Sequence, residues 1–146
     1  MASVALCSFA LCASLFQLTS CKKAVAQTAG CPTPTYPISG LWIGTYNTDQ
    51  VSHVPTYFSM TIYPDKSLIV KARGVPPAQS VVYATGSWTM VGDTLKYTDT
   101  TINYPTQVIQ KGTMIYSNTG VLSNCKWQDV TGQVYTGTFS SLLRVN

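Results

Sequence analysis

From residue 38 to the end of the chain, apolar and polar side chains alternate with a period of two in short runs. In residues 56–63, for example, Phe58, Met60 and Ile62 occupy every second position. Alternation of this kind puts one set of side chains on each face of a β-strand. No stretch shows the 3.6-residue period of an amphipathic helix, so this part of the chain is expected to be all-β.

Residues that favour turns divide this part of the chain into eight runs. The clearest turns are residues 64–67, 91–93 and 118–120, which contain Pro, Asp, Asn and Gly. A looser loop with His53 and Pro55 is expected between the first two strands. The expected strands are residues 40–47, 56–63, 68–73, 80–90, 94–99, 107–117, 121–128 and 133–145. Gly86, inside the fourth run, is expected to mark a bend or bulge.

Eight sequential strands with short connections predict an antiparallel meander. In about 110 residues, closure into an up-and-down barrel hides both edge strands. A two-sheet β-sandwich is the alternative. An eight-stranded barrel is just wide enough to be filled by its own side chains or to hold one small ligand.

The N-terminal part has a different character. Residues 2–18 form an apolar run with single polar interruptions, a length that suits a signal peptide better than a membrane span. The run ends in Leu18-Thr19-Ser20-Cys21, which resembles the lipobox of bacterial lipoproteins. This resemblance implies that residues 1–20 are a removable signal peptide and that Cys21 carries a lipid anchor. The run departs from the usual signal peptide because no Lys or Arg precedes it.

Two other interpretations of this segment stay open. An ordinary signal peptidase could cut after Ala24-Val25-Ala26, although Lys22 and Lys23 would then lie between the apolar run and the cleavage site. Residues 1–20 could also remain as a membrane anchor, although the run is short and carries interspersed serines.

Residues 21–37 are rich in Ala, Thr and Pro and lack strand or helix periodicity, so they are interpreted as a tether. Residues 38–146 form the expected folded domain. The residue after Cys21 is Lys22 rather than Asp, and under the sorting rule of Gram-negative lipoproteins the resemblance implies the outer membrane as the location.

The five cysteines fit the lipoprotein interpretation. Removal of the signal peptide discards Cys7 and Cys12 and acylation uses Cys21, which leaves Cys31 and Cys125. In an oxidising compartment these two could form a disulfide across a loop of about 94 residues and stabilise the fold by about 4–5 kcal/mol. Two unpaired thiols are the alternative.

The first expected strand carries Gly40-Leu41-Trp42, which is similar to the Gly-x-Trp motif of the lipocalin superfamily. More specifically, the chain resembles the small lipocalin-like lipoproteins of bacteria of the Bacteroides type. The resemblance implies that Trp42 closes one end of the barrel beneath Arg144. Strict alternation would put Arg144 on the face opposite Phe139, so this geometry needs a one-residue bulge, expected at Ser140-Ser141.

The chain has few residues that support catalysis or metal binding. It contains one His, no Glu, and five Asp, of which two would have to act together as a glycosidase pair. The candidates for such a pair are Asp49, Asp65, Asp93, Asp99 and Asp129. No nucleophile, metal or phosphate motif is present, so no enzymatic activity, metal or cofactor is expected. The net charge of +4 is spread along the chain, which argues against nucleic-acid binding.

Aromatic residues are the one surplus, with three Trp and nine Tyr. Two functions are consistent with this. In the first, which the lipocalin resemblance implies, the barrel interior holds a small apolar ligand among Phe58, Met60, Trp88, Leu95, Tyr97 and Phe139. In the second, the barrel is fully packed and an exposed face binds a protein or glycan at the cell surface, as an inhibitor or interaction module.

Overall fold

Each hairpin turn in the described part of the chain joins two antiparallel neighbours in one sheet. The computed structural model describes residues 37–74, 80–132 and 134–145. The strands are β1 (Gly40–Thr48), β2 (Ser52–Ile62), β3 (Ser67–Arg73), β4 (Val81–Val91), β5 (Thr94–Thr101), β6 (Ile109–Ser117), β7 (Val121–Asp129), β8 (Thr136–Thr138) and β9 (Leu142–Val145). The described residues contain no helix, so none is long and apolar enough to cross a membrane.

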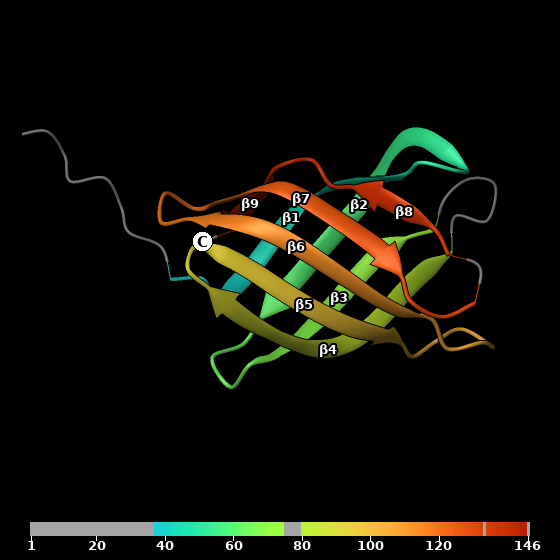
Figure 1. Cartoon of the computed structure of the whole chain (residues 1–146), viewed down its shortest axis with the longest axis horizontal. Coiled ribbons are helices and arrows are strands. Elements are labelled where there is room, and N and C mark those ends of the chain that lie inside the picture. The colour runs from blue at the N-terminus through green and yellow to red at the C-terminus, as the bar shows by residue number, and fades with distance from the viewer. Residues whose placement is uncertain (1–36, 75–79, 133, 146) are drawn as a thin grey trace, which may run out of the picture. The chain divides into compact units, whose positions relative to one another are not determined.

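The sheet closes into a barrel. The strands follow the order β6-β5-β4-β3-β2-β1-β9-β7-β8, and the additional β6–β7 pairing joins the two sides (Figure 1). The short strands β8 and β9 both pair with β7 and together occupy the eighth position. The predicted fold class, an eight-stranded antiparallel up-and-down barrel of lipocalin-like form, is confirmed.

The break between β8 and β9 includes Ser140 and Ser141, where the bulge was expected. The backbone N–H of Ser140 donates to the carbonyl of Thr45, and the Ser140 hydroxyl accepts from the Thr45 N–H. The break changes the alternation, so that Leu142 is fully buried while Leu143 is 57% exposed.

Two local expectations are wrong. The loop expected around His53 and Pro55 is the beginning of β2, because Thr48 pairs with Ser52 after a register shift in β1 and continues the hairpin. Gly86 marks no bulge, since β4 and β5 pair through it without a shift. A side chain there would meet β5, because an added Cβ would lie 2.0 Å from the carbonyl oxygen of Thr98.

The two ends of the barrel differ in how they are filled. At one end lie the β2–β3, β4–β5 and β6–β7 turns, to the left in Figure 1, and its interior is solid. We call it the packed end. Its fully buried side chains include Trp42, Ile62, Leu68, Leu95, Met114, Leu122 and Leu142. The opposite end, with the β1–β2, β5–β6 and β7–β8 connections, is the open end.

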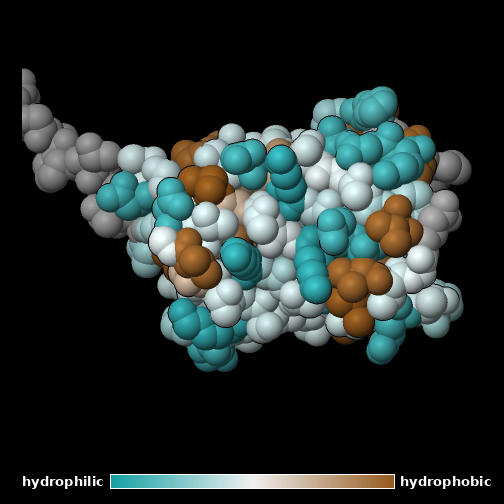
Figure 2. Space-filling model, viewed as in Figure 1, coloured by the Kyte–Doolittle hydropathy of each residue, from teal (hydrophilic) through white to brown (hydrophobic). Residues whose placement is uncertain are grey.

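The outer surface is mixed in polarity. Lys71, Lys96 and Lys111 point outward from alternate positions of their strands. On the face shown in Figure 2, apolar residues lie in separate spots among polar and neutral ones. Isolated apolar residues of this kind are normal on a soluble surface.

Candidate functional site

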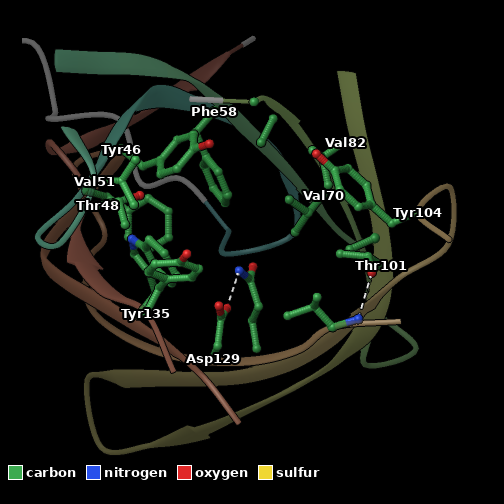
Figure 3. Close-up of a pocket in the computed structure, with 17 residues that line it drawn as sticks. Tyr46, Thr48, Val51, Phe58, Val70, Val82, Thr101, Tyr104, Asp129 and Tyr135 are labelled. Carbon is green, nitrogen blue, oxygen red and sulfur yellow. Dashed lines mark hydrogen bonds between the residues drawn. The ribbon is translucent and has the colours of Figure 1, made fainter. Parts of the chain in front are cut away.

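The open end of the barrel contains a cavity of about 310 Å³ (Figure 3). Its wall combines apolar, aromatic and polar side chains from β1 to β7 and from the segments that follow β5 and β7. The polar members are Tyr46, Thr48, Thr101, Tyr104, Gln110, Asp129 and Tyr135. Ligand sites in proteins have this composition, with an apolar lining and a few placed polar groups.

One side of the wall is a cluster of four aromatic rings, which we call the aromatic cluster. Tyr46 is its centre, with ring centroids 6.3 Å from Phe58, 6.0 Å from Trp127 and 6.5 Å from Phe139. The ring centroids of Phe58 and Phe139 are 4.4 Å apart. Hydrogen bonds fix two of the rings, because the Tyr46 hydroxyl donates to the carbonyl of Arg73 and the Trp127 indole donates to that of Asn47. Burial raises the pKa of Tyr46 to about 12, so its hydroxyl stays a donor at neutral pH.

The neighbouring wall is made of small aliphatic side chains, which explains why the barrel is hollow here. Val70, Ala72, Val82 and Ala84 face inward from β3 and β4 and line the cavity. Alanine and valine leave space that leucine, methionine and tryptophan fill at the packed end.

The third side of the cavity is next to two aspartic acid side chains. Asp99 on β5 pairs with Gln110 on β6, and Gln110 pairs with Asp129 on β7, so the three residues form a row across neighbouring strands. We call it the acidic row. The Gln110 side-chain amide donates to Asp129 Oδ1 at 2.7 Å, the bond drawn at the bottom of the cavity in Figure 3. Gln110 and Asp129 line the cavity, whereas Asp99, which pairs with Gln110 and precedes the lining residue Thr101 by two positions on β5, is not part of the lining.

Asp99 is a buried carboxyl group without a hydrogen-bond partner among the described residues. Its side chain is 1% exposed, and neither carboxylate oxygen has a partner among the residues that the structure describes. On the β4 side it pairs with Gly86, where an added Cβ would lie 2.8 Å from its own Cβ. Burial, and then the charge of Asp129, raise the pKa of Asp99 to about 7.

The pKa values of its neighbours Asp129 and Tyr97 are raised as well. Burial raises the pKa of Asp129, and hydrogen bonds from Gln110 and from the Tyr135 backbone oppose that rise. Burial, together with the charge of Asp99, raises the pKa of Tyr97 well above its ordinary value. The acidic row therefore holds two carboxyl groups that bind protons more tightly than carboxyls in water do.

The six residues expected to surround a ligand fall into two groups. Phe58 and Phe139 line the cavity. Met60, Trp88, Leu95 and Tyr97 are buried in the continuous core and are absent from the cavity lining. The Trp88 indole, for example, donates to the carbonyl of Tyr63 at the packed end.

Trp42 and Arg144 are cross-strand partners on β1 and β9. Trp42 is fully buried, and its indole donates to the carbonyl of Ile38 at 2.7 Å. The Arg144 guanidinium donates to the carbonyls of Pro37 and Ser39 and lies over Gly40, where an added Cβ would be 2.7 Å from it. The glycine of Gly40-Leu41-Trp42 thus provides the space for the arginine, at a φ of 139° that disfavours other residues.

The remaining candidate residues lie elsewhere or outside the described residues. Cys21 and Cys31 belong to the segment 1–36, which the structure does not describe. Cys125 is a free thiol, buried inside the barrel, and burial raises its pKa to about 12. His53 is exposed. No group of three or more metal-binding side chains occurs within 37–74, 80–132 and 134–145.

The acidic row is the feature that the sequence predictions missed as a unit. Asp99 and Asp129 were considered as catalytic candidates without a common location. The signal was present, because the alternation that turns Leu95 and Tyr97 inward also turns Asp99 inward.

No family of known proteins, no curated protein sequence and no solved structure matches the chain.

Proposed function

We propose that the protein is a non-enzymatic, lipid-anchored lipoprotein of the cell envelope whose barrel binds a small apolar ligand. The observation that carries the binding function is the open-end cavity of about 310 Å³, which is lined mainly by apolar and aromatic side chains. A hollow interior favours this function over a packed barrel that binds through its exterior. The separated apolar spots on the face in Figure 2 add no support for an external docking surface.

Binding without catalysis agrees with the arrangement of the carboxyl groups. A glycosidase needs two carboxyl groups that both reach the substrate. Asp129 lines the cavity, but Asp99 is 1% exposed and is absent from the lining. Asp49, Asp65 and Asp93 are exposed, and each accepts a hydrogen bond from a threonine or serine hydroxyl outside the cavity.

A pair of matched variants tests the binding function. Val82→Phe puts a larger side chain into the cavity, and Val81→Phe makes the same change at the adjacent outward position, which is 42% exposed. Binding of octanol, measured by titration calorimetry, is expected for the wild type and for Val81→Phe and is expected to be lost in Val82→Phe. Equal binding by all three proteins, or binding by none, would contradict the proposal.

The lipid anchor rests on Leu18-Thr19-Ser20-Cys21, and the outer-membrane location on Lys22. Mass spectrometry of the protein from the membrane fraction is expected to show a chain that begins at an acylated Cys21. Cys21→Ser is expected to prevent acylation. A wild-type chain with an unmodified Cys21 would reject the anchor and leave the binding function untouched.

A further inference from the structure

We propose that the ligand of the open-end cavity is an amphiphilic organic cation, a small molecule whose apolar body ends in an ammonium or guanidinium group. This inference rests on the proposed binding function and specifies its ligand class. It follows from three features that meet in one cavity: the acidic row, the aromatic cluster and the aliphatic wall.

The first step concerns charge. The cavity is lined by one ionisable carboxyl group, that of Asp129, and a second, that of Asp99, is buried on the neighbouring strand beside the lining residue Gln110. No Lys, Arg or His is among the described residues that line it. A buried carboxylate is unfavourable unless a cation or hydrogen-bond donors compensate it. The chain supplies Gln110 to Asp129 but supplies no hydrogen bond from a described residue to Asp99.

The second step concerns the rings beside that charge. Trp127 precedes Asp129 by two residues on β7, so both face the interior, and the Tyr46 ring packs against both Trp127 and Phe139. In Figure 3 the carboxylate of Asp129 points into the cavity next to this group of rings. Ring faces attract organic cations, and an aromatic cluster next to a carboxylate is a favourable environment for an ammonium group.

The third step concerns the body of the ligand. Val70, Val82 and Ala84 provide an aliphatic wall without hydrogen-bonding side chains, which suits an alkyl or aryl group. The volume of about 310 Å³ is at the small end of the range for ligand sites, about 300–1,000 Å³. A short body with one cationic group therefore fits best. An anion of the same shape would be repelled by the acidic row.

Three ligands that share an eight-carbon chain test the proposal. Octylamine, octanol and octanoate carry an ammonium, a hydroxyl and a carboxylate head group, which are cationic, neutral and anionic near pH 8, and their affinities for the purified protein can be compared by titration calorimetry at that pH. Octylamine is expected to bind at least about tenfold more tightly than octanol, and octanoate most weakly.

Two variants locate the head group. Asp129→Asn is expected to weaken octylamine binding by about tenfold and to leave octanol binding within about twofold of the wild type. Asp99→Asn serves the same purpose if the first variant does not fold, which thermal unfolding will show. Asp93→Asn is the control, because it removes the same charge from an exposed turn at the packed end and is expected to change neither affinity.

The outcomes separate this inference from the proposed function. If octanol binds as tightly as octylamine, or octanoate binds best, the cation is rejected and the apolar cavity stands. If octylamine binds best but neither Asp variant weakens it, the acidic row is not the recognition site and the inference fails. If none of the three ligands binds, the proposed function fails with it.

Discussion

The two ends of the barrel are made by the same strands, in the same alternation, and yet differ in content. At the packed end the inward positions hold Trp42, Leu95 and Leu142, all fully buried. At the open end they hold small aliphatic residues, an aromatic cluster and two carboxyl groups. The difference teaches that strand pattern determines the barrel, whereas the size and charge of the inward residues determine where it is hollow.

The comparison also separates stability from binding. Side chains at the packed end gain from apolar burial and close contact, which stabilise the fold. Asp99 at the open end destabilises the folded state, because it is buried without a hydrogen-bond partner among the described residues. Polar groups that weaken a fold are frequent at functional sites.

Replacement of a tryptophan at each end is expected to include the largest single loss of stability, that of Trp42→Ala. Trp42→Ala removes a fully buried indole and its hydrogen bond to Ile38, and should lower the free energy of unfolding by about 3–5 kcal/mol. Trp127→Ala removes the same atoms from the wall of an existing cavity that water can enter, so its cost should be at least about 1 kcal/mol smaller. Urea denaturation of both variants measures the difference. An equal or larger cost for Trp127→Ala would show that the open end is as tightly packed as the other.

The pH dependence of stability is expected to come from the open end. As pH rises from the ordinary carboxyl pKa of 3.8 towards about 7, Asp99 ionises in the unfolded chain but stays protonated in the folded one. The folded state then binds more protons, so the free energy of unfolding falls over this range, by up to about 4 kcal/mol, and changes little from this group above it. The titratable groups that interact with Asp99 are Tyr97 and Asp129, while Gly86 and Gln110 on the flanking strands do not titrate.

Asp99→Asn should remove most of this decline. The variant is expected to be more stable than the wild type by about 2–4 kcal/mol near pH 8 and close to it near pH 4. Asp93→Asn, in the exposed turn at the packed end, is the matched control and should keep the wild-type decline. Parallel curves for wild type and Asp99→Asn between these two pH values would refute the assignment.

The sequence predicts the architecture better than the site, and Asp99 shows why. Period-two alternation and turn residues are local signals, and they predicted the eight strand positions except for the beginning of β2, while the bulge at Ser140 and Ser141 was expected from alternation together with the lipocalin resemblance. The same alternation accommodates Ala84 and Leu95 equally, so it cannot tell which end is hollow. Asp is rarely buried without a partner, and sequence reasoning therefore treats Asp99 as a surface or catalytic residue. Only the pairing of Asp99, Gln110 and Asp129 across three strands reveals the acidic row.

A glycine substitution tests how the packed end is closed. Gly40 has a φ of 139°, and an added Cβ would lie 2.7 Å from the Arg144 guanidinium. Gly40→Ala should therefore lower the free energy of unfolding by about 2 kcal/mol. Gly132→Ala is the control, because Gly132 also has a positive φ, 76°, but an added Cβ there would meet nothing within 4 Å. The difference between the two variants, measured by urea denaturation, reports the steric contact with Arg144 together with the greater backbone strain at a φ of 139°, and identical losses would show that neither adds to the cost at Gly40.

The smallest change in stability is expected where the barrel already has room. Val82→Phe extends into the cavity, so the added ring gains apolar contacts without overpacking, and the free energy of unfolding should change by less than about 1 kcal/mol. An enlargement in the filled interior, Leu122→Phe, should lower it by about 1–3 kcal/mol, because Leu122 is fully buried at the packed end. Thermal and urea unfolding of the two variants give the comparison directly. If Val82→Phe is as harmful as Leu122→Phe, the open end cannot accept an extra ring, and the cavity is too small for the ligand proposed for it.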